Sequence, residues 1–539
     1  MIRNLVEITD TTENSAAVCI VGAGIAGLVL ASRLQRHGIS VAILESGPVN
    51  PSEAPNPLNE VETSGQTYEG AMRGRSRGLG GNSGRWGGQL FPIRIEAIAA
   101  RPRLNAPGWL VNWDEIERHL PEIETLFGIP HGSYNARDIS TAKARRWPHD
   151  AEFDVGFSKV PSFQNRNIAT LFSDIIKQSS SLNIWLNATV TGFDLDRETG
   201  RIKSVTARHQ NGSAITIKAD QFVLAAGTIE STRLLLALDA DNDHRPFAQC
   251  EALGRYFSDH ISLPLAELLP RSGSGRQRLN AMFAHSFDVA STLRSTRLEL
   301  SPQAQAADNV ACAYGHISME IASDSGFALL RDFLLARQRS GSSRDLRSLV
   351  KMAKTVPYLA GIGYRRYVSK YLHWQPDAKL HLHVVAEQLP DAANRISLSH
   401  KRDALGGRVP VIAWRMREAE IRAFRAYMRR FDGYWKRHPF HTFGDLHWCS
   451  APDALSKQLL SRFGSGDIFH PTGSTRMGTD PRNAVVDPNL KTFAVGNMWI
   501  GSAAVFPTMS SANPTLTLMQ LMLRLGDHLA AQQMRVSAT

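Results

Sequence analysis

One histidine near the C-terminus stands in a stretch rich in glycine and small polar residues. His470 begins the sequence HPTGSTRMG, which ends at Gly478. A histidine can take a proton from a hydroxyl because its pKa lies close to neutrality. The surrounding spacing indicates neither a metal site nor an activated nucleophile, so we expect no metal. Taken alone, the stretch favours a buried structural histidine, and any chemistry depends on other motifs.

A glycine motif near the N-terminus predicts a dinucleotide site. Gly22, Gly24 and Gly27 have GxGxxG spacing between the apolar run VCIV and a helical segment. Gly22 permits a tight turn, Gly24 lets the backbone approach a pyrophosphate, and Gly27 lets the helix pack on the strand. The helix N-terminus adds free N–H groups for phosphates. Glu45 ends the next apolar run, where it can bind ribose hydroxyls, and its acidity favours FAD or NAD.

Two further segments have the composition of ligand-binding turns. Residues 78–88, GLGGNSGRWGG, hold too many glycines for a helix or strand interior and suit close approach of the backbone to a flat ligand. A flexible linker is the alternative, but Leu79 and Trp86 are residues of a buried type. At 225–227, AAG follows an apolar strand and precedes a helix, which is another turn of the kind used around nucleotides.

The middle of the chain predicts a different architecture. Residues 379–415 alternate apolar and polar positions, as half-buried antiparallel strands do. Residues 416–438 have the spacing of a helix with one buried face. The apolar positions of that helix are Ile421, Phe424, Tyr427, Met428 and Phe431. The segment TLTLMQLMLRLGDHLAAQQ predicts a last helix with an apolar face.

Composition limits the class of protein. A chain of 539 residues predicts two domains or one elaborated large domain, and 43% hydrophobic residues are ordinary for a globular protein. The four cysteines are far apart and form no CxxC pair, which suggests a reducing compartment. The N-terminus has no signal-peptide core, and no apolar run is long enough to span a bilayer. We therefore expect a cytoplasmic protein.

The net charge of +11 raises the question of an anionic partner. The basic residues are scattered, with one denser region at 331–374, and no nucleic-acid-binding motif accompanies them. We expect no nucleic-acid partner and favour a solvated basic face. The alternatives are an anionic substrate, a protein partner or a lipid headgroup. Membrane association is therefore possible but is not the favoured interpretation.

Taken in chain order, these motifs resemble the glucose–methanol–choline (GMC) oxidoreductases, a family of FAD enzymes. The matching segments cover about a third of the residues and lie mostly at the two ends, whereas about 265–460 carries no matching motif. The segments are GxGxxG with Glu45, 78–88, AAGTIESTRLL at 225–235, LGRYFSDH at 253–260, HPTGSTRMG at 470–478 and VFPTMSSANPTLTL at 505–518.

The resemblance implies an α/β fold, α+β overall. A Rossmann-like FAD-binding domain with a parallel sheet would combine with a substrate domain whose antiparallel sheet is flanked by helices. Residues 1–265 would be mainly FAD-binding, with part of 91–165 on the substrate side, and 266–463 would be mainly substrate-binding. Residues 464–539 would return to the FAD-binding domain and carry the catalytic pair.

The resemblance also implies roles for single residues. His470 is the expected base, and Asn513 is its partner, whose amide can donate to the substrate oxygen. His260 and His447 are expected to be structural. The expected cofactor-binding residues are Gly22, Gly24, Gly27, Glu45, Gly80, Gly81, Asn82, Ser83, Trp86, Gly87, Gly88, Val190, Ala226, Gly227, Gly501, Ser502, Asn513 and Thr515.

One departure from the family bears on how the flavin is held. Some sugar oxidases of the family have a histidine in the glycine cluster that bonds covalently to FAD. Arg85 stands at that position here, and arginine cannot make the same bond. We therefore predict non-covalent FAD.

The expected function is FAD-dependent oxidation of an alcohol to a carbonyl. The RWGG form of the glycine cluster is similar to that of relatives acting on sugars and cyclic polyols, which favours a small-molecule sugar, glycoside or polyol. One alternative is a flavin-containing lyase without net redox turnover. Another is a membrane- or partner-coupled dehydrogenase of a lipophilic alcohol, docking through 327–374. The electron acceptor stays open.

Overall fold

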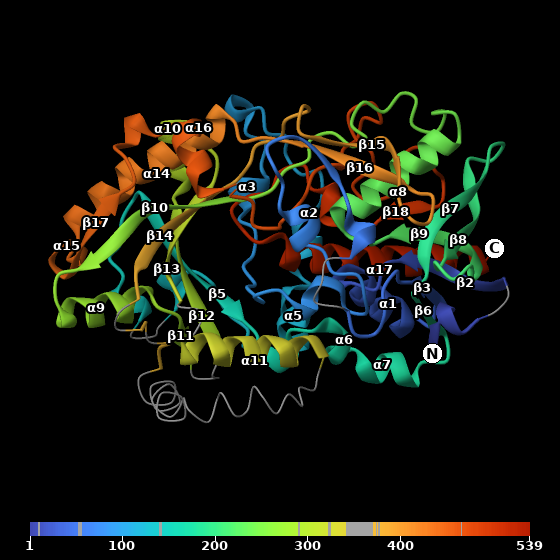
Figure 1. Ribbon diagram of the computed structural model, residues 1–539, viewed down its shortest axis with the longest axis horizontal. Coiled ribbons are helices and arrows are strands. Elements are labelled where there is room, and N and C mark those ends of the chain that lie inside the picture. The colour runs from blue at the N-terminus through green and yellow to red at the C-terminus, as the bar shows by residue number, and fades with distance from the viewer. Residues whose placement is uncertain are drawn as a thin grey trace.

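The computed structural model describes residues 1–8, 11–51, 56–139, 143–288, 292–321, 325–340, 370–372, 374–375, 378–464 and 466–538. These residues form two halves side by side, each built around one large sheet (Figure 1). Both chain ends lie in the same half, where the blue and red ribbons meet.

The half that holds both chain ends contains an eight-stranded, mostly parallel sheet. Strand pairs β1–β6, β6–β3, β3–β2, β2–β9 and β9–β18 are parallel, whereas β9–β8 and β8–β7 are antiparallel. The strands are β1 (Ile2–Asn4), β2 (Thr12–Val21), β3 (Val41–Leu44), β6 (Leu182–Leu186), β7 (Thr189–Asp196), β8 (Arg201–Arg208), β9 (Ala214–Leu224) and β18 (Met498–Ile500).

Helices from both ends of the chain cover this parallel sheet. α1 (Ile25–Arg36) follows β2, and the C-terminal α17 (Pro514–Ala538) packs against it. Arg33 of α1 forms two hydrogen bonds with Asp527 of α17, at 2.5 and 2.9 Å. α8 (Gly227–Asp241) follows β9. The C-terminal segment is thus part of the same hydrophobic core as the N-terminal glycine motif.

The other half contains a seven-stranded antiparallel sheet. Its order is β11-β12-β13-β14-β10-β17, and β5 also pairs with β12. The strands are β5 (Phe153–Val160), β10 (Ile261–Pro270), β11 (Ser286–Phe287), β12 (Leu293–Leu300), β13 (Ala313–Met319), β14 (Leu380–Ala386) and β17 (Gly444–Trp448). The predicted combination of a parallel and an antiparallel sheet is therefore confirmed.

One face of the antiparallel sheet packs against α14 (Glu418–Arg437), the helix expected at 416–438. Its five predicted apolar residues are all buried, with at most 2% of each exposed. The Tyr427 hydroxyl donates to the carbonyl of Leu298 at 3.1 Å, and Gly315 leaves room for that hydroxyl beside the sheet. Because side chains alternate along a strand, the opposite face carries the intervening residues.

A small third sheet shows where the middle of the chain returns to the parallel-sheet half. β15 (Arg395–Arg402) and β16 (Arg408–Trp414) form an antiparallel pair, and β16 pairs in parallel with β4 (Glu62–Gly65). β15 and β16 contact α8 and lie near it in Figure 1. The domain boundaries at 265 and 463 stay a prediction.

The remaining helices are mostly short. They are α2 (Gly70–Arg73), α3 (Ile95–Ile98), α4 (Trp113–Glu117), α5 (Leu120–Leu126), α6 (Ile168–Leu171), α7 (Ser173–Gln178), α9 (Gly273–Phe283), α10 (Pro302–Asp308), α11 (Gly326–Ser340), α15 (Phe440–Phe443) and α16 (Lys457–Leu460). The basic segment 327–374 begins in α11, but 341–369 lies outside the described residues. Among the helices described, none is both long and apolar enough to cross a membrane.

We predict that Gly27→Ala destabilises the fold. A Cβ at Gly27 would lie 2.0 Å from the carbonyl oxygen of Gly22, so α1 would have to move away from β2. Such overpacking costs roughly 1–3 kcal/mol. Thermal unfolding should therefore show a lower Tm. Gly192→Ala in β7 is the matched control, because a Cβ there meets no atom within 4 Å. Equal Tm values for the two variants would contradict the prediction.

Candidate active site

A cavity of about 240 Å³ lies where β2, β3 and β9 end. It gathers residues from segments far apart in the sequence, as expected for a ligand at the carboxyl ends of parallel strands. Eleven of the expected cofactor-binding residues line it. They are Gly22, Gly24, Glu45, Gly81, Asn82, Val190, Ala226, Gly227, Gly501, Ser502 and Thr515.

The other expected residues do not line this cavity; they are Gly27, Gly80, Ser83, Trp86, Gly87, Gly88 and Asn513. Several of them shape the loop around it. The Ser83 hydroxyl donates to the carbonyl of Gly80 at 2.6 Å, and the Trp86 indole donates to the carbonyl of Arg166 at 2.9 Å. Gly80 N–H donates to the carbonyl of Ala23, which joins the glycine cluster to the GxGxxG turn.

Three glycines at the cavity have backbones that other residues rarely adopt. Gly22 has φ +106°, Gly81 has φ +54° and Gly227 has φ +78°, and a Cβ at Gly22 would lie 2.6 Å from the carbonyl oxygen of Ala225. Gly24 precedes α1, and a Cβ there would meet no atom within 4 Å, although Gly24 lines the cavity. The backbone N–H groups of α1 are therefore open to a ligand phosphate.

Glu45 joins three backbone segments at the cavity wall. Its carboxylate accepts hydrogen bonds from the backbone N–H groups of Ala23, Gly47 and Gly78 at 2.8–2.9 Å. Burial nevertheless raises the pKa of Glu45. The Ser46 hydroxyl also donates to Oε1 at 3.4 Å, whereas Oε2 accepts only the N–H of Ala23, so Oε2 can still accept a ribose hydroxyl.

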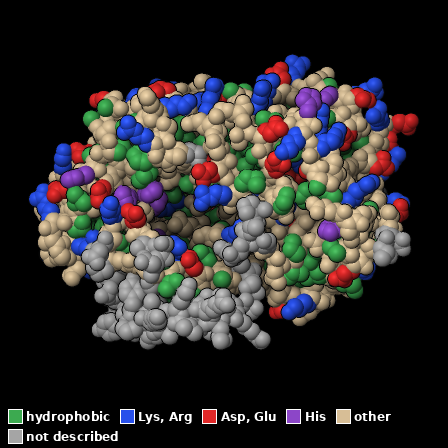
Figure 2. Space-filling model, viewed as in Figure 1, with side chains coloured by type: hydrophobic (Ala, Val, Ile, Leu, Met, Phe, Trp, Pro, Cys, Tyr) green, Lys and Arg blue, Asp and Glu red, His purple; other side chains and the backbone are tan. Residues whose placement is uncertain are grey.

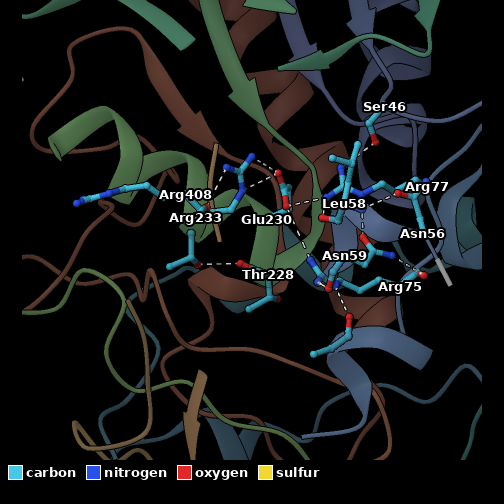
Figure 3. Close-up of polar contacts among 12 residues, drawn as sticks. Ser46, Asn56, Leu58, Asn59, Arg75, Arg77, Thr228, Glu230, Arg233 and Arg408 are labelled. Carbon is cyan, nitrogen blue, oxygen red and sulfur yellow. Dashed lines mark hydrogen bonds and ion pairs between the residues drawn. The ribbon is translucent and has the colours of Figure 1, made fainter. Parts of the chain in front are cut away.

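A cluster of arginines surrounds one buried glutamate beside this cavity (Figure 3). Glu230 of α8 accepts hydrogen bonds from Arg77 at 2.9 Å and from Arg233 at 2.6 Å, and Arg75 Nη1 lies 3.8 Å away. Arg75 and Arg77 line the cavity and bring positive charge to its wall, which the carboxylates of Glu230 and Glu45 also line. Burial and, to a smaller extent, the charge of Arg77 lower the pKa of Arg75 to about 9. A diphosphate in this cavity would offset that charge, so the residues present fit a dinucleotide such as FAD.

His470 lies close to this cavity and contacts a second histidine. The next residue, Pro471, lines the cavity, and its carbonyl accepts a hydrogen bond from Thr228 of α8 at 2.6 Å. Nδ1 of His470 lies 3.0 Å from Nδ1 of His260, and the two rings meet edge to face. Burial lowers the pKa of His470 well below its ordinary value, and His260 and Arg297 lower it further.

Asn513 lies at the same site, directly before α17. Its side-chain carbonyl accepts a hydrogen bond from Arg297 Nη1 at 3.4 Å. Arg297 is 1% exposed and also donates to Glu299 and to the backbone carbonyl of Ser511. Its guanidinium lies 3.5 Å from the centre of the Tyr314 ring. The charged head of Arg297 is thus fixed, and with it the orientation of Asn513.

Two buried carboxylates hold the backbone on either side of the histidines. Glu387 pairs with Arg101 through two 2.6 Å contacts and accepts the backbone N–H of Ser510 at 3.1 Å. Asp259 accepts the backbone N–H of His470 at 2.9 Å and the Tyr68 hydroxyl at 2.6 Å. Burial raises the pKa of Asp259 to about 8.

The antiparallel sheet presents a polar face toward this site. The register places Arg297 and Glu299 of β12 on the same face as Tyr314 and His316 of β13 and His383 of β14. Burial lowers the pKa of His316 to about 3 and that of His383 to about 4, so both rings are neutral. Figure 2 shows histidine side chains beside a hollow over this half of the molecule.

Sequence reasoning missed several of these residues. His260 was expected to be a structural histidine, but its ring contacts His470. Its adjacency to Asp259 in LGRYFSDH was the available signal. Arg297 lies in the region without family motifs, so no signal identified it. His447 is exposed on β17, opposite Glu267, away from the site.

Comparisons with known proteins agree with this architecture. Residues 16–260 match the pyridine nucleotide-disulphide oxidoreductase family, and residues 390–521 match the GMC oxidoreductase family. The chain is 23% identical to the fructose dehydrogenase large subunit of Gluconobacter japonicus, over 95% of this chain and 97% of that protein. It is 21% identical to 2-methyl-1,2-propanediol dehydrogenase of Mycolicibacterium austroafricanum, over 96% of both chains.

A short sequence match and a similarity of fold also relate the chain to oxidases. A stretch of 48 residues, 9% of this chain and 8% of the other, is 42% identical to pyranose 2-oxidase of Tricholoma matsutake. The fold is similar to that of formate oxidase from Aspergillus oryzae, with a TM-score of 0.55 at 15% identity, over 98% of this chain and 100% of the other. The chain is therefore an FAD-dependent oxidoreductase, and its residues 390–521 match the glucose–methanol–choline oxidoreductase family.

Proposed function

We propose that this enzyme oxidises an alcohol, a hydroxyl of a sugar, glycoside or other cyclic polyol, to the carbonyl. One observation carries the proposal. Among the described residues, Nε2 of His470 and the amide nitrogen of Asn513 have no hydrogen-bond partner, while the other polar atom of each side chain is bound. One free acceptor and one free donor at the same site suit a substrate hydroxyl.

The two side chains would divide the work on that hydroxyl. His470 takes the hydroxyl proton on Nε2, and the Asn513 amide donates to the substrate oxygen as negative charge develops there. The carbon that bears this hydroxyl loses a hydride, which leaves with the C–H electron pair, and a C=O double bond forms between that carbon and the oxygen. Because burial lowers the pKa of His470, the ring is unprotonated at neutral pH and able to accept the proton. Holding one oxygen between two fixed groups also orients the C–H bond.

FAD, when bound, supplies the acceptor for that hydride. The residues that would hold it are those lining the cavity, with Gly24 and the α1 N-terminus at the diphosphate and Glu45 at a ribose. Gly80, Ser83, Trp86, Gly87 and Gly88 would support the surrounding loop rather than line the cavity, and Gly27 would let α1 pack closely on β2. FAD would be bound without a covalent link, because Arg85 stands where some relatives have the histidine that forms such a link.

The polar sheet face supports a polyhydroxylated substrate. Neutral His316 and His383 can each donate and accept a hydrogen bond, which suits hydroxyl groups better than charged ones. His316 Nδ1 is buried and lacks a partner among the residues described. The names of the relatives, fructose dehydrogenase and pyranose 2-oxidase, point to sugars as well.

A partner-coupled dehydrogenase is the second candidate. The relative from Gluconobacter japonicus is named a large subunit, and it matches 95% of this chain. Electrons would then pass to a partner rather than directly to a small acceptor. Catalysis at His470 and Asn513 would be unchanged.

We expect a sugar or polyol to bleach the flavin absorbance of the enzyme under anaerobic conditions. His470→Ala should slow this bleaching by roughly two to four orders of magnitude, because it removes the base. Stopped-flow absorbance measures the rate. His447→Ala is the control, since His447 is exposed and away from the site.

A lyase would keep its yellow spectrum with every alcohol, so the absence of bleaching across a panel of sugars and alcohols would contradict the proposed oxidation. A near-native bleaching rate in His470→Ala would instead remove His470 from the mechanism and leave the reaction class standing.

We expect acid denaturation to release all of the flavin. Arg85 cannot form the covalent bond that a histidine would, so unfolding alone should free the cofactor. Precipitating the purified protein and recording the absorbance of the supernatant measures the release. Colour retained on the precipitate would show a covalent link.

We expect Gly24→Val to weaken FAD binding. The new side chain would project into the cavity, where a Cβ meets no protein atom within 4 Å. The dissociation constant should rise by about tenfold or more, equivalent to about 1.4 kcal/mol. Fluorescence titration of the apoprotein with FAD measures it, and Gly192→Val in β7 is the control. Unchanged affinity would place the cofactor elsewhere.

A further inference from the structure

His260 makes two contacts that define where its proton lies. The side chain is 1% exposed, and its Nε2 lies 2.7 Å from the backbone carbonyl oxygen of Ser510. A carbonyl oxygen only accepts, so Nε2 of His260 carries a hydrogen. Burial lowers the pKa of His260 to about 4, so the ring holds one proton at neutral pH. Nδ1 of His260 is therefore an unprotonated acceptor.

The protonation of His470 follows from that of His260. The two Nδ1 atoms are 3.0 Å apart, and one of them must donate. Because Nδ1 of His260 has no hydrogen, Nδ1 of His470 must carry one. A neutral imidazole has a single N–H, which leaves Nε2 of His470 with a free lone pair. In the described part of the chain, that Nε2 has no partner.

We propose that His260 is the positioning residue that fixes the proton of His470 on Nδ1, so that Nε2 is the basic atom facing the substrate. This inference rests on the proposed function, in which His470 is the base. When Nε2 takes the substrate proton, Nδ1–H of His470 still donates to His260, which stabilises the new positive charge. The histidine pair thus works as a base and its orienting acceptor.

The carbonyl that fixes His260 is itself held in place. Ser510 has a left-handed backbone, φ +63°, which costs a non-glycine residue energy and persists only where its surroundings enforce it. Its N–H donates to Glu387, which Arg101 grips with two contacts. Phe469, directly before His470, also has a left-handed backbone, φ +66°. The carbonyl that binds His260 and the residue that precedes His470 thus both have a left-handed backbone.

Charged groups around the pair favour the same arrangement. Arg297 lowers the pKa of both His260 and His470, and Glu387 partly offsets this at His260. Asp259 binds the His470 backbone and the Tyr68 hydroxyl. No negative group among the described residues contacts either imidazole ring directly, so neither ring is held in its charged form.

The test compares His260→Leu with His260→Gln. Glutamine carries one acceptor and one donor on its amide, so it can bind His470 Nδ1–H and the Ser510 carbonyl, whereas leucine can bind neither. His260→Leu should lower the rate of flavin reduction by about 10²-fold or more, with little change in substrate affinity or FAD content. His260→Gln should recover most of the rate.

Nitrogen-15 NMR of histidine-labelled protein supplies a readout independent of turnover. Comparison with His470→Gln assigns the His470 signals. We expect the Nδ1–H form in wild type and in His260→Gln, and loss of that preference in His260→Leu. His447→Leu is the control and should change neither the rate nor these signals.

The outcomes separate this inference from the proposed function. A near-native rate and an Nδ1–H signal in His260→Leu would overturn the inference. If His260→Leu does not fold or bind FAD, a folded His260→Gln variant that reduces its flavin as slowly as His470→Ala would also overturn it. A near-native rate in His470→Ala would instead remove the proposed base and leave the measured His470 tautomer to decide the role of His260.

Discussion

The short loop before α17, residues 510–513, is bound by side chains of the antiparallel-sheet half of the enzyme. Four side chains from the antiparallel-sheet half bind residues 510–513. His260 and Arg297 donate to the carbonyls of Ser510 and Ser511, Glu387 accepts the Ser510 N–H, and Glu299 accepts the Ser511 hydroxyl. The loop carries Asn513 and orders His260, which contacts His470. The relative positions of His260, His470 and Asn513 therefore depend on this set of contacts.

The charged side chains that bind residues 510–513 are buried, and a buried charge requires its particular partner to stay in place. Arg101 and Glu387 form a pair whose carboxylate is fully enclosed, and Arg297 is 1% exposed. Replacing a whole buried pair with apolar residues is often neutral, whereas removing one partner costs about 3–5 kcal/mol. Such pairs therefore do more to fix an arrangement than to stabilise the fold as a whole. At this site they fix a strained backbone and a hydrogen-bond direction.

The two ends of the site differ in electrostatics in a way that fits their tasks. At the cavity, Arg75 and Arg77 bring positive charge close to the buried carboxylate of Glu230. Near His470, Arg297 is balanced by Glu299, and the histidines are neutral because burial lowers their pKa values. Neutral rings can exchange hydrogen bonds with hydroxyls and can still take up a proton. The electrostatics of the two regions are thus consistent with the proposal that one binds a diphosphate and the other an uncharged alcohol.

Local motifs were enough to predict many of the residues that line the cavity. GxGxxG, Glu45 and the AAG turn act through their own backbone conformation and the strands beside them, so spacing alone located residues that line the cavity. The antiparallel strands and α14 were also predictable, because alternation and helical spacing are local patterns. The contact between His260 and His470 spans 210 positions in the chain, and Arg297 reaches Asn513 across 216. No single-sequence pattern encodes such pairs, because they depend on how the sheets pack. The sequence by itself indicated FAD and most of the residues that line the cavity; only the tertiary structure decided that His260 contacts His470 and that Arg297 binds Asn513, because these neighbours are brought together in folding.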